Sequence, residues 1–269
     1  MMAGSFLRAA LLRSVVFVIC ATMLAPILIV MIVSFSGDGY LKFPPQTFSD
    51  QWYLRFLTNA RWVGSLWNSL LIALMSCVVA TAMGFLAAYA MVRGAFSMRK
   101  AVMALLLMPL IVPHVVTAIA IYFMSARFNL IGFKPWIALA HAVVALPVVL
   151  IILQSALKAV DPNLERAAMI FGCGRAGVFR RVILPLVTPS VVSALLFSFL
   201  ISFDELVISL FLAGIRSETL PVRIWNSLML EVEPTIAAVS TLLIAATCLA
   251  LVIEWGMRRY QEHRFGAKA

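Results

Sequence analysis

The stretch DPNLERAAMIFGCGRAGVFRRVILP, residues 161–185, is basic, punctuated by glycine and placed between two strongly apolar segments. Asp161 and Pro162 are typical of a helix N-cap and first helical residue, and Gly172 with Gly174 is typical of a helix end. This spacing predicts a helix of about three turns. Such a helix is too short and too polar to cross a bilayer. A membrane protein with such an insert is expected to contact a partner through it.

Composition places the rest of the chain in a membrane. Of 269 residues, 64% are apolar and only 12% are charged, whereas about half of a soluble domain is apolar. Apolar runs of roughly 20 or more residues, enough to cross about 30 Å of hydrocarbon, lie near 14–35, 66–92, 101–125, 136–157, 186–212 and 235–257. These runs predict an all-α membrane protein with six transmembrane helices and a short cytoplasmic helix.

The distribution of Lys and Arg predicts the orientation. Loops on the side of the two termini and of residues 161–185 carry about twice as many Lys and Arg as the opposite loops, and cytoplasmic loops are enriched in these residues. Both termini and the 161–185 loop are therefore expected in the cytoplasm. Charge dispersed in this way accounts for the net charge of +10. Without a recognisable binding module, it also excludes nucleic acid as a partner.

Small residues in the second apolar run predict close helix packing. Ala80, Gly84 and Ala88 recur at four-residue intervals, and such a stripe lets another helix approach closely within lipid. The stripe is therefore expected to be structural.

Prolines and histidines mark the third and fourth runs. Pro109 and Pro113 precede His114, and His141 precedes Pro147. Proline frees a backbone carbonyl inside a helix, so both runs are expected to be kinked. The histidines do not form a pair at metal-ligand spacing. They are expected to be hydrogen-bonded residues of the bundle interior.

Asp204 and Glu205 interrupt an apolar segment over residues 191–212. An acidic side chain at mid-membrane costs about 2.5–3.5 kcal/mol on insertion scales, so at least one of the two is expected to face water or a cation. Two interpretations stay open. Either the pair lies on a path for a cationic substrate, or the segment leaves the membrane early and the acids form a cap or an interhelical bond. Neighbouring helical positions point about 100° apart, so a single bidentate site is not expected.

The 161–185 loop resembles the Glu-Ala-Ala loop of permease subunits from ATP-binding-cassette importers. The residues that carry the resemblance are Glu165, Ala167, Ala168, Gly172, Ile183, Leu184 and Pro185. The family places its glutamate immediately before the two alanines, whereas here Arg166 holds that place and Glu165 precedes it. The resemblance implies that the helix docks in a groove of the ATPase, whereas an ordinary positive-inside loop is the alternative. The implied ATPase-coupling residues are Glu165, Arg166, Ala167, Ala168 and Gly172.

Other stretches are similar to the spermidine/putrescine branch of these permeases. They are FPPQTFSDQWY at 43–53, NSL at 68–70 with Gly84 and the AAY at 87–89, SFDELVISLFLAG at 202–214, and TLPVRIWNSL at 219–228. The resemblance implies a single transmembrane permease domain over residues 1–269 in a bacterial inner membrane. It also implies a second permease subunit, an ATPase dimer, a periplasmic substrate-binding protein and a small cationic organic substrate.

Motifs for chemistry are missing from the sequence. It has no GxxxxGK[ST] phosphate loop, no HExxH and no nucleophile elbow, so the chain is not expected to be an enzyme or to hydrolyse ATP. No cofactor or metal site is indicated, and the four cysteines form no disulfide framework. The alternative function is a self-contained ion-coupled carrier or channel that uses Asp204 and Glu205. Inverted repeats would favour that alternative, and no convincing repeat is present.

The segments assigned to the periplasm, 36–64, 126–135 and 213–234, are too short to enclose a solute. A docking surface is the expected role. Its candidates are Trp52, Tyr53, Arg55, Arg61 and Trp62, an aromatic and charged set common at interfaces. Anchoring of the aromatic rings among lipid headgroups is the alternative.

Overall fold

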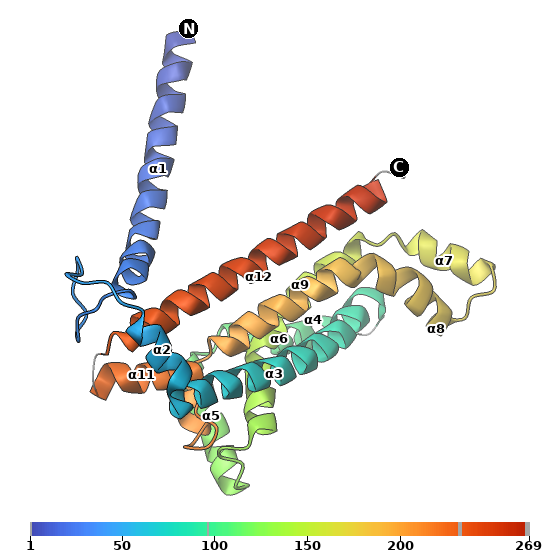
Figure 1. Cartoon of the computed structure of the whole chain (residues 1–269). Helices are drawn as coiled ribbons and strands as arrows, with labels where there is room; N and C mark the ends of the chain where they lie inside the picture. The colour runs from blue at the N-terminus through green and yellow to red at the C-terminus, as the bar shows by residue number, and fades with distance from the viewer. Residues whose placement is uncertain (1, 96, 231–232, 267–269) are drawn as a thin grey trace. The chain divides into compact units, whose positions relative to one another are not determined.

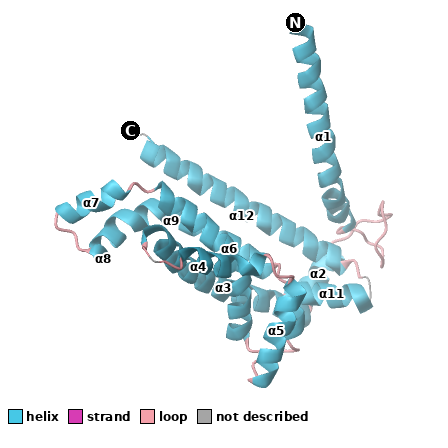
Figure 2. Cartoon of the chain, turned by 180° about the vertical axis from the view of Figure 1, so that it is seen from behind, coloured by secondary structure: helices cyan, strands magenta, loops and turns pink. Residues whose placement is uncertain are grey.

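The computed structural model describes residues 2–95, 97–230 and 233–266, and its regular structure is helical (Figure 1; Figure 2). An isolated antiparallel bridge joins Ser36 to Phe48. The elements are α1 (Met2–Val33), α2 (Gln51–Thr58), α3 (Ala60–Arg93), α4 (Arg99–Leu107), η1 (Met108–Leu110), α5 (His114–Arg127), α6 (Lys134–Ala159), α7 (Pro162–Ile170), α8 (Arg175–Val178), η2 (Phe179–Ile183), α9 (Leu184–Phe203), α10 (Val207–Leu212), α11 (Leu220–Leu230) and α12 (Thr235–Gly266).

The chain divides into two compact units. The first comprises Met1–Val63 and Ile224–Val252, and the second comprises Gly64–Arg223 and Ile253–Ala269. The candidate ATPase-coupling residues and the acid pair Asp204 and Glu205 lie in the second unit, whereas the docking candidates at 52–62 lie in the first. A single permease domain over the whole chain stays a prediction.

The described residues contain five candidate membrane spans, or six if a bent pair of helices counts as one span, in agreement with the predicted membrane fold. Five helices are long and apolar enough to cross a bilayer, and a pair of helices bent by 97° would be the sixth. The bend separates Arg99–Leu110 from His114–Arg127, because Pro113 adopts an extended conformation as the N-cap of α5. The kink predicted for the third run is thus confirmed. By contrast, α6 runs through Pro147 as one helix.

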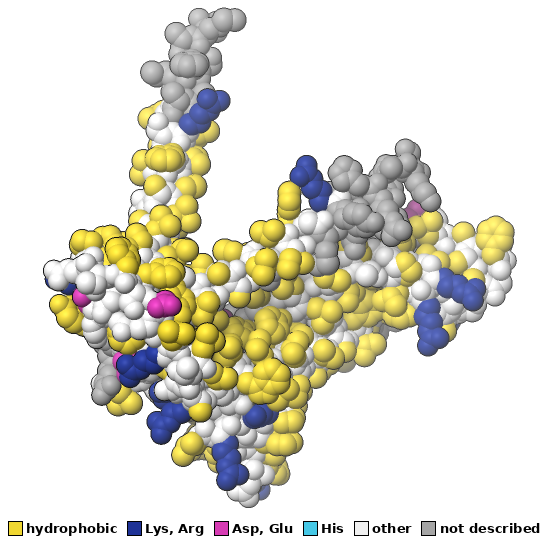
Figure 3. Space-filling view, viewed as in Figure 1, with side chains coloured by type: hydrophobic (Ala, Val, Ile, Leu, Met, Phe, Trp, Pro, Cys, Tyr) yellow, Lys and Arg dark blue, Asp and Glu magenta, His cyan; other side chains and the backbone are white. Residues whose placement is uncertain are grey.

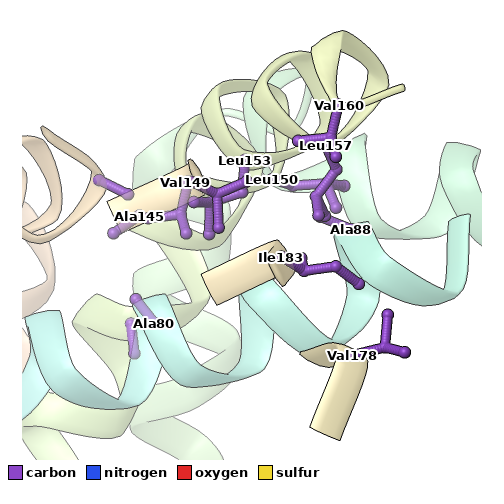
Figure 4. Close-up of a cluster of buried hydrophobic side chains, with 13 residues drawn as sticks. Ala80, Ala88, Ala145, Val149, Leu150, Leu153, Leu157, Val160, Val178 and Ile183 are labelled. Atoms are coloured by element: carbon purple, nitrogen blue, oxygen red, sulfur yellow. The ribbon is translucent and has the colours of Figure 1, made fainter. Parts of the chain in front are cut away.

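The main core of the second unit lies where α3 meets α6 and the η2 turn. Figure 4 shows Ala80 and Ala88 of α3 near the aliphatic side chains of α6, with Val178 and Ile183 beside them. A Cβ atom built at Gly84 would overlap the side chain of Val149. The small-residue stripe therefore brings the two helices together, as predicted.

Two of the short sequence motifs contact each other across the second unit. The Asn68 side-chain amide donates to the carbonyls of Arg216 and Glu218, at 3.3 and 3.0 Å. The Ser69 hydroxyl oxygen accepts a bond of 2.8 Å from the N–H of Leu220, the first residue of α11. These bonds hold the connection between α10 and α11 on α3, so the NSL motif has a structural role.

Large apolar side chains cover much of the surface in Figure 3, which is expected for helices that face lipid. Examples are Leu86 of α3 and Phe123 of α5, which are 71% and 68% exposed. Lys and Arg side chains gather beside α7 and α8 in the same view. An aqueous surface there agrees with the predicted placement of residues 161–185 outside the bilayer.

Trp52 and Trp62 differ from the sequence-based expectation. They are only 7% and 1% exposed, and the Trp52 indole N–H donates to the Ser36 carbonyl at 2.6 Å. A docking or headgroup role requires an accessible ring, so the prediction is wrong for these two residues. Arg55 keeps an exposed side chain, and its guanidinium pairs with Glu233 at 3.0 Å.

Replacing Gly84 with alanine tests the packing of α3 on α6. Gly84→Ala should lower the free energy of unfolding by about 1–3 kcal/mol, because the added methyl group overlaps Val149. Gly64→Ala is the matched control, since it lies in the same helix and its Cβ would meet nothing within 4 Å. Denaturation of the purified protein in detergent, followed by circular dichroism, measures both variants. Equal stability of the two variants would contradict the packing.

Candidate functional site

The short helix α7 begins and ends at the residues that the sequence predicts. The Asp161 Oδ1 atom accepts a bond of 2.9 Å from the N–H of Asn163, and Pro162 is the first helical residue. After the helix, Gly172 has a φ of 86°, a left-handed conformation that favours glycine. The helix has 9 residues, so it is confirmed as a helix too short to span a membrane.

The helix α7 and the residue after it expose large apolar side chains. Ile170 is 83% exposed and Phe171 is 88% exposed, while Leu164 and Met169 are each about half exposed. Full burial of one such side chain is worth about 1.5–3 kcal/mol. An apolar groove on a partner would provide that burial.

One side of α7 faces its own chain. Ala168 is partly buried and packs, together with Cys173, against the core of the second unit. Ala167 is exposed. The two alanines thus have different surroundings, and the face available to a partner contains Ala167, Ile170 and Phe171. A contact of either alanine with an ATPase stays a prediction.

Glu165 forms an ion pair within the chain. Its Oε1 atom lies 2.7 Å from Nε and 2.6 Å from Nη2 of Arg93, the last residue of α3. Arg93 Nη2 also donates to the carbonyl of Val160 at 3.0 Å. Arg166, in the place where the family has its glutamate, is exposed and lies 3.4 Å from the Asn163 side-chain oxygen. Arg166 is therefore the more accessible of the two charges.

The second half of the 161–185 loop is helical and continues into the membrane. The fifth span runs as one helix from Arg175 to Phe203, and a π-helical turn, η2, lies inside it. The Phe179 ring anchors this turn because it packs edge to face on Phe85 and Tyr89 of α3, at 5.7 and 6.0 Å between centroids. Hydropathy alone predicts a later start for this helix because its first turns are basic.

The fifth span stops at the acid pair. Asp204 follows the last residue of α9 and is exposed, whereas Glu205 is only 7% exposed. The Glu205 Oε1 atom accepts a bond of 3.0 Å from the N–H of Ile208 in the first turn of α10. Glu205 thus forms a helix cap, as the second interpretation predicts. The two carboxylates have different surroundings, as expected, and their place on a substrate path stays a prediction.

The end of the fifth span meets the bent span at Glu205. Its Oε2 atom lies 3.8 Å from Nδ1 of His114, the first residue of α5 after the 97° bend. The His114 side chain is half exposed. Backbone without regular helix is tolerated at membrane depth where protein or a water-filled cavity covers it. A buried carboxylate beside a half-exposed imidazole thus forms a polar point between the two spans.

His141 of α6 forms hydrogen bonds on both sides of the break between α9 and α10. It is 1% exposed, and its Nδ1 atom lies 3.1 Å from the carbonyl and 2.9 Å from the hydroxyl of Ser202. Because a carbonyl oxygen only accepts, Nδ1 donates to it. Nε2 then accepts a bond of 3.0 Å from the Ser209 hydroxyl. The prediction of a satisfied interior histidine is confirmed for His141.

Sequence reasoning missed the partners of these residues. Arg93 is one of several basic residues at helix ends, and nothing local distinguishes it as a partner of Glu165. Ser202 precedes the acid pair and Ser209 follows it. Both serines lie more than 60 positions from His141 in the sequence. Among the described residues, no group of His, Cys, Asp and Glu is arranged to hold a metal ion.

Comparison with known protein families gives a match over residues 80–262, to the family described as binding-protein-dependent transport system inner membrane component. Among curated relatives, the spermidine/putrescine permease protein PotC of Haemophilus influenzae is 33% identical over 97% of this chain and 100% of its own. PotC of Escherichia coli is 29% identical over 93% of each chain. The putrescine permease PotI of Escherichia coli is 30% identical over 86% of this chain and 84% of its own.

Solved structures show the same fold. A bacterial alginate ABC transporter, in complex with an alginate pentasaccharide-bound periplasmic protein, superposes with a TM-score of 0.71 at 16% identity. The alignment covers 97% of this chain and 95% of the transporter chain. At this identity the likeness concerns the fold, which is that of an importer permease.

Replacing His141 tests whether its imidazole stabilises the connection between α9 and α10. His141→Phe should lower the free energy of unfolding by about 1–3 kcal/mol, because buried polar groups of Ser202 and Ser209 lose their partner. Val143→Phe on the exposed side of α6 is the control and should have little effect. Detergent unfolding curves compare the variants. A His141→Phe protein as stable as the control would contradict this role.

Proposed function

The chain belongs to the family of inner membrane components of binding-protein-dependent transport systems, and on this premise we propose that it forms part of the pore of an ATP-driven polyamine importer. Permeases of this family span the inner membrane and leave ATP hydrolysis to a separate subunit. Family membership favours the importer over a self-contained carrier or channel. The proposed substrate class is spermidine, putrescine or a related small organic cation.

The observation that carries the importer proposal is the short helix α7. It is capped at both ends, lies outside the apolar core of the spans and presents Ile170 and Phe171 to solvent. An exposed apolar helix face of this size fits a groove on a partner. Since the sequence has no phosphate-binding loop, the proposed partner is the ATPase dimer, which docks on α7 and drives the spans between inward and outward access.

The proposal for a cationic substrate rests on the relatives and on the acid pair. PotC and PotI carry polyamine transport in their names, and this chain has one exposed and one buried carboxylate where the fifth span stops. An ammonium group that passes this point exchanges water for Asp204. The short periplasmic segments support a separate periplasmic binding protein as the main source of selectivity. A second permease subunit completes the proposed pore.

Uptake by proteoliposomes tests the proposed function. The chain is reconstituted with its second permease, ATPase dimer and periplasmic binding protein, and labelled spermidine and putrescine are supplied with ATP inside the vesicles. Uptake that requires both ATP and the binding protein is the expected result. Uptake by this chain alone, driven by an ion gradient, would overturn the proposal in favour of a carrier.

Asp204→Asn tests the cation path. Loss of the exposed carboxylate should lower polyamine uptake severalfold to about tenfold, since about 1.4 kcal/mol of attraction corresponds to a factor of ten. Asp50→Asn is the matched control, because Asp50 is an exposed acid whose side chain makes no cap bond. Assembly of both variants is checked by recovery of the complex. Parental uptake by assembled Asp204→Asn would remove this residue from the path.

A further inference from the structure

Arg93 connects three elements at one end of the second unit. It is the last residue of α3, it donates to the Val160 carbonyl where α6 ends, and it pairs with Glu165 in α7. The side chains of the two charged residues are only 18% and 14% exposed. An ion pair screened from water in this way, with added hydrogen bonds, is much less easily broken than a surface pair.

The helices that receive these contacts are packed firmly against each other. Gly84 lets α3 lie directly on Val149 of α6, and Thr81 of α3 lies 3.4 Å from the Ser198 hydroxyl of α9. By contrast, α7 joins α6 through a short extended link at Val160 and Asp161. Without Arg93, the ends of α3 and α6 would lose their polar contact with α7, and that link together with the packing of Ala168 would be left to hold the helix.

We propose that Arg93 is a positioning residue for energy coupling, which ties α7 through Glu165 to the ends of α3 and α6. This inference rests on the proposed function. A displacement of α7 by the ATPase is then passed to the packed spans rather than absorbed at Val160 and Asp161. Glu165, in turn, acts within this chain, and the contacts to the ATPase come from the exposed side of α7.

A charge exchange in the reconstituted complex tests the proposal. Arg93→Glu and Glu165→Arg are prepared separately and together, with Lys100→Glu as the control for an exposed cytoplasmic-side charge on α4. The readout is polyamine taken up per ATP hydrolysed, because a change in assembly alone alters both rates together. Each single variant should lower this ratio about tenfold while ATP hydrolysis continues, since the reversal places two like charges together at a part-buried contact.

The double variant restores opposite charges and should return the ratio to within about threefold of the parental complex. The control should keep the parental ratio. Single variants that keep the parental ratio, or a double variant as poor as the singles, would overturn the proposal. Should Arg93→Glu fail to assemble, Glu165→Gln replaces it, because its amide oxygen still accepts from Arg93 but carries no charge. A parental ratio in that variant would equally overturn the ion-pair role.

The parental complex separates the two proposals. Absence of ATP-driven uptake by the parental complex would contradict the proposed function itself. ATP-driven uptake that is unaffected by the Arg93 variants would contradict only the positioning role.

Discussion

Hydrocarbon offers a backbone no hydrogen-bond partner, and this constraint determines where the chain is helical and where side chains must intervene. Most of the length that lies in the membrane satisfies the constraint by forming long helices. Where the fifth span stops, Glu205 accepts the N–H of Ile208 and His141 bonds both Ser202 and Ser209. Side chains therefore bridge the break between α9 and α10, which gives Glu205 a structural reason to lie in an apolar segment.

Close packing joins these helices into one body, which the proposed coupling requires. Gly84 lets α3 approach α6 closely, and the Phe179 ring packs the first turns of the fifth span against α3. Attached to this body, α7 has one side packed on the chain through Ala168 and one side that exposes Ile170 and Phe171. A short helix with these two sides can receive a push from a partner and pass it on to the spans.

Local patterns predicted the spans, the small-residue stripe and both ends of α7, because hydropathy and capping are properties of neighbouring residues. They also predicted a kink near Pro113, although the 97° angle depends on packing. Pairings across long sequence separations were not predictable, since Arg93 and Glu165 look like ordinary charges at helix ends. The prediction for Trp52 was wrong for the same reason. The partner of its indole N–H is the backbone carbonyl of Ser36, and a backbone carbonyl cannot be recognised as a partner from the sequence.

Site-specific cross-linking to the ATPase tests most directly whether energy enters through the exposed side of α7. The four native cysteines are first replaced, and single cysteines are then introduced as Phe171→Cys and Ala168→Cys in the assembled importer. Efficient cross-linking from position 171 and little from position 168 is the predicted result, since Phe171 is 88% exposed whereas Ala168 packs on its own chain. Cross-linking from position 168 alone, or no cross-link to the ATPase from position 171, would contradict entry of energy through this face.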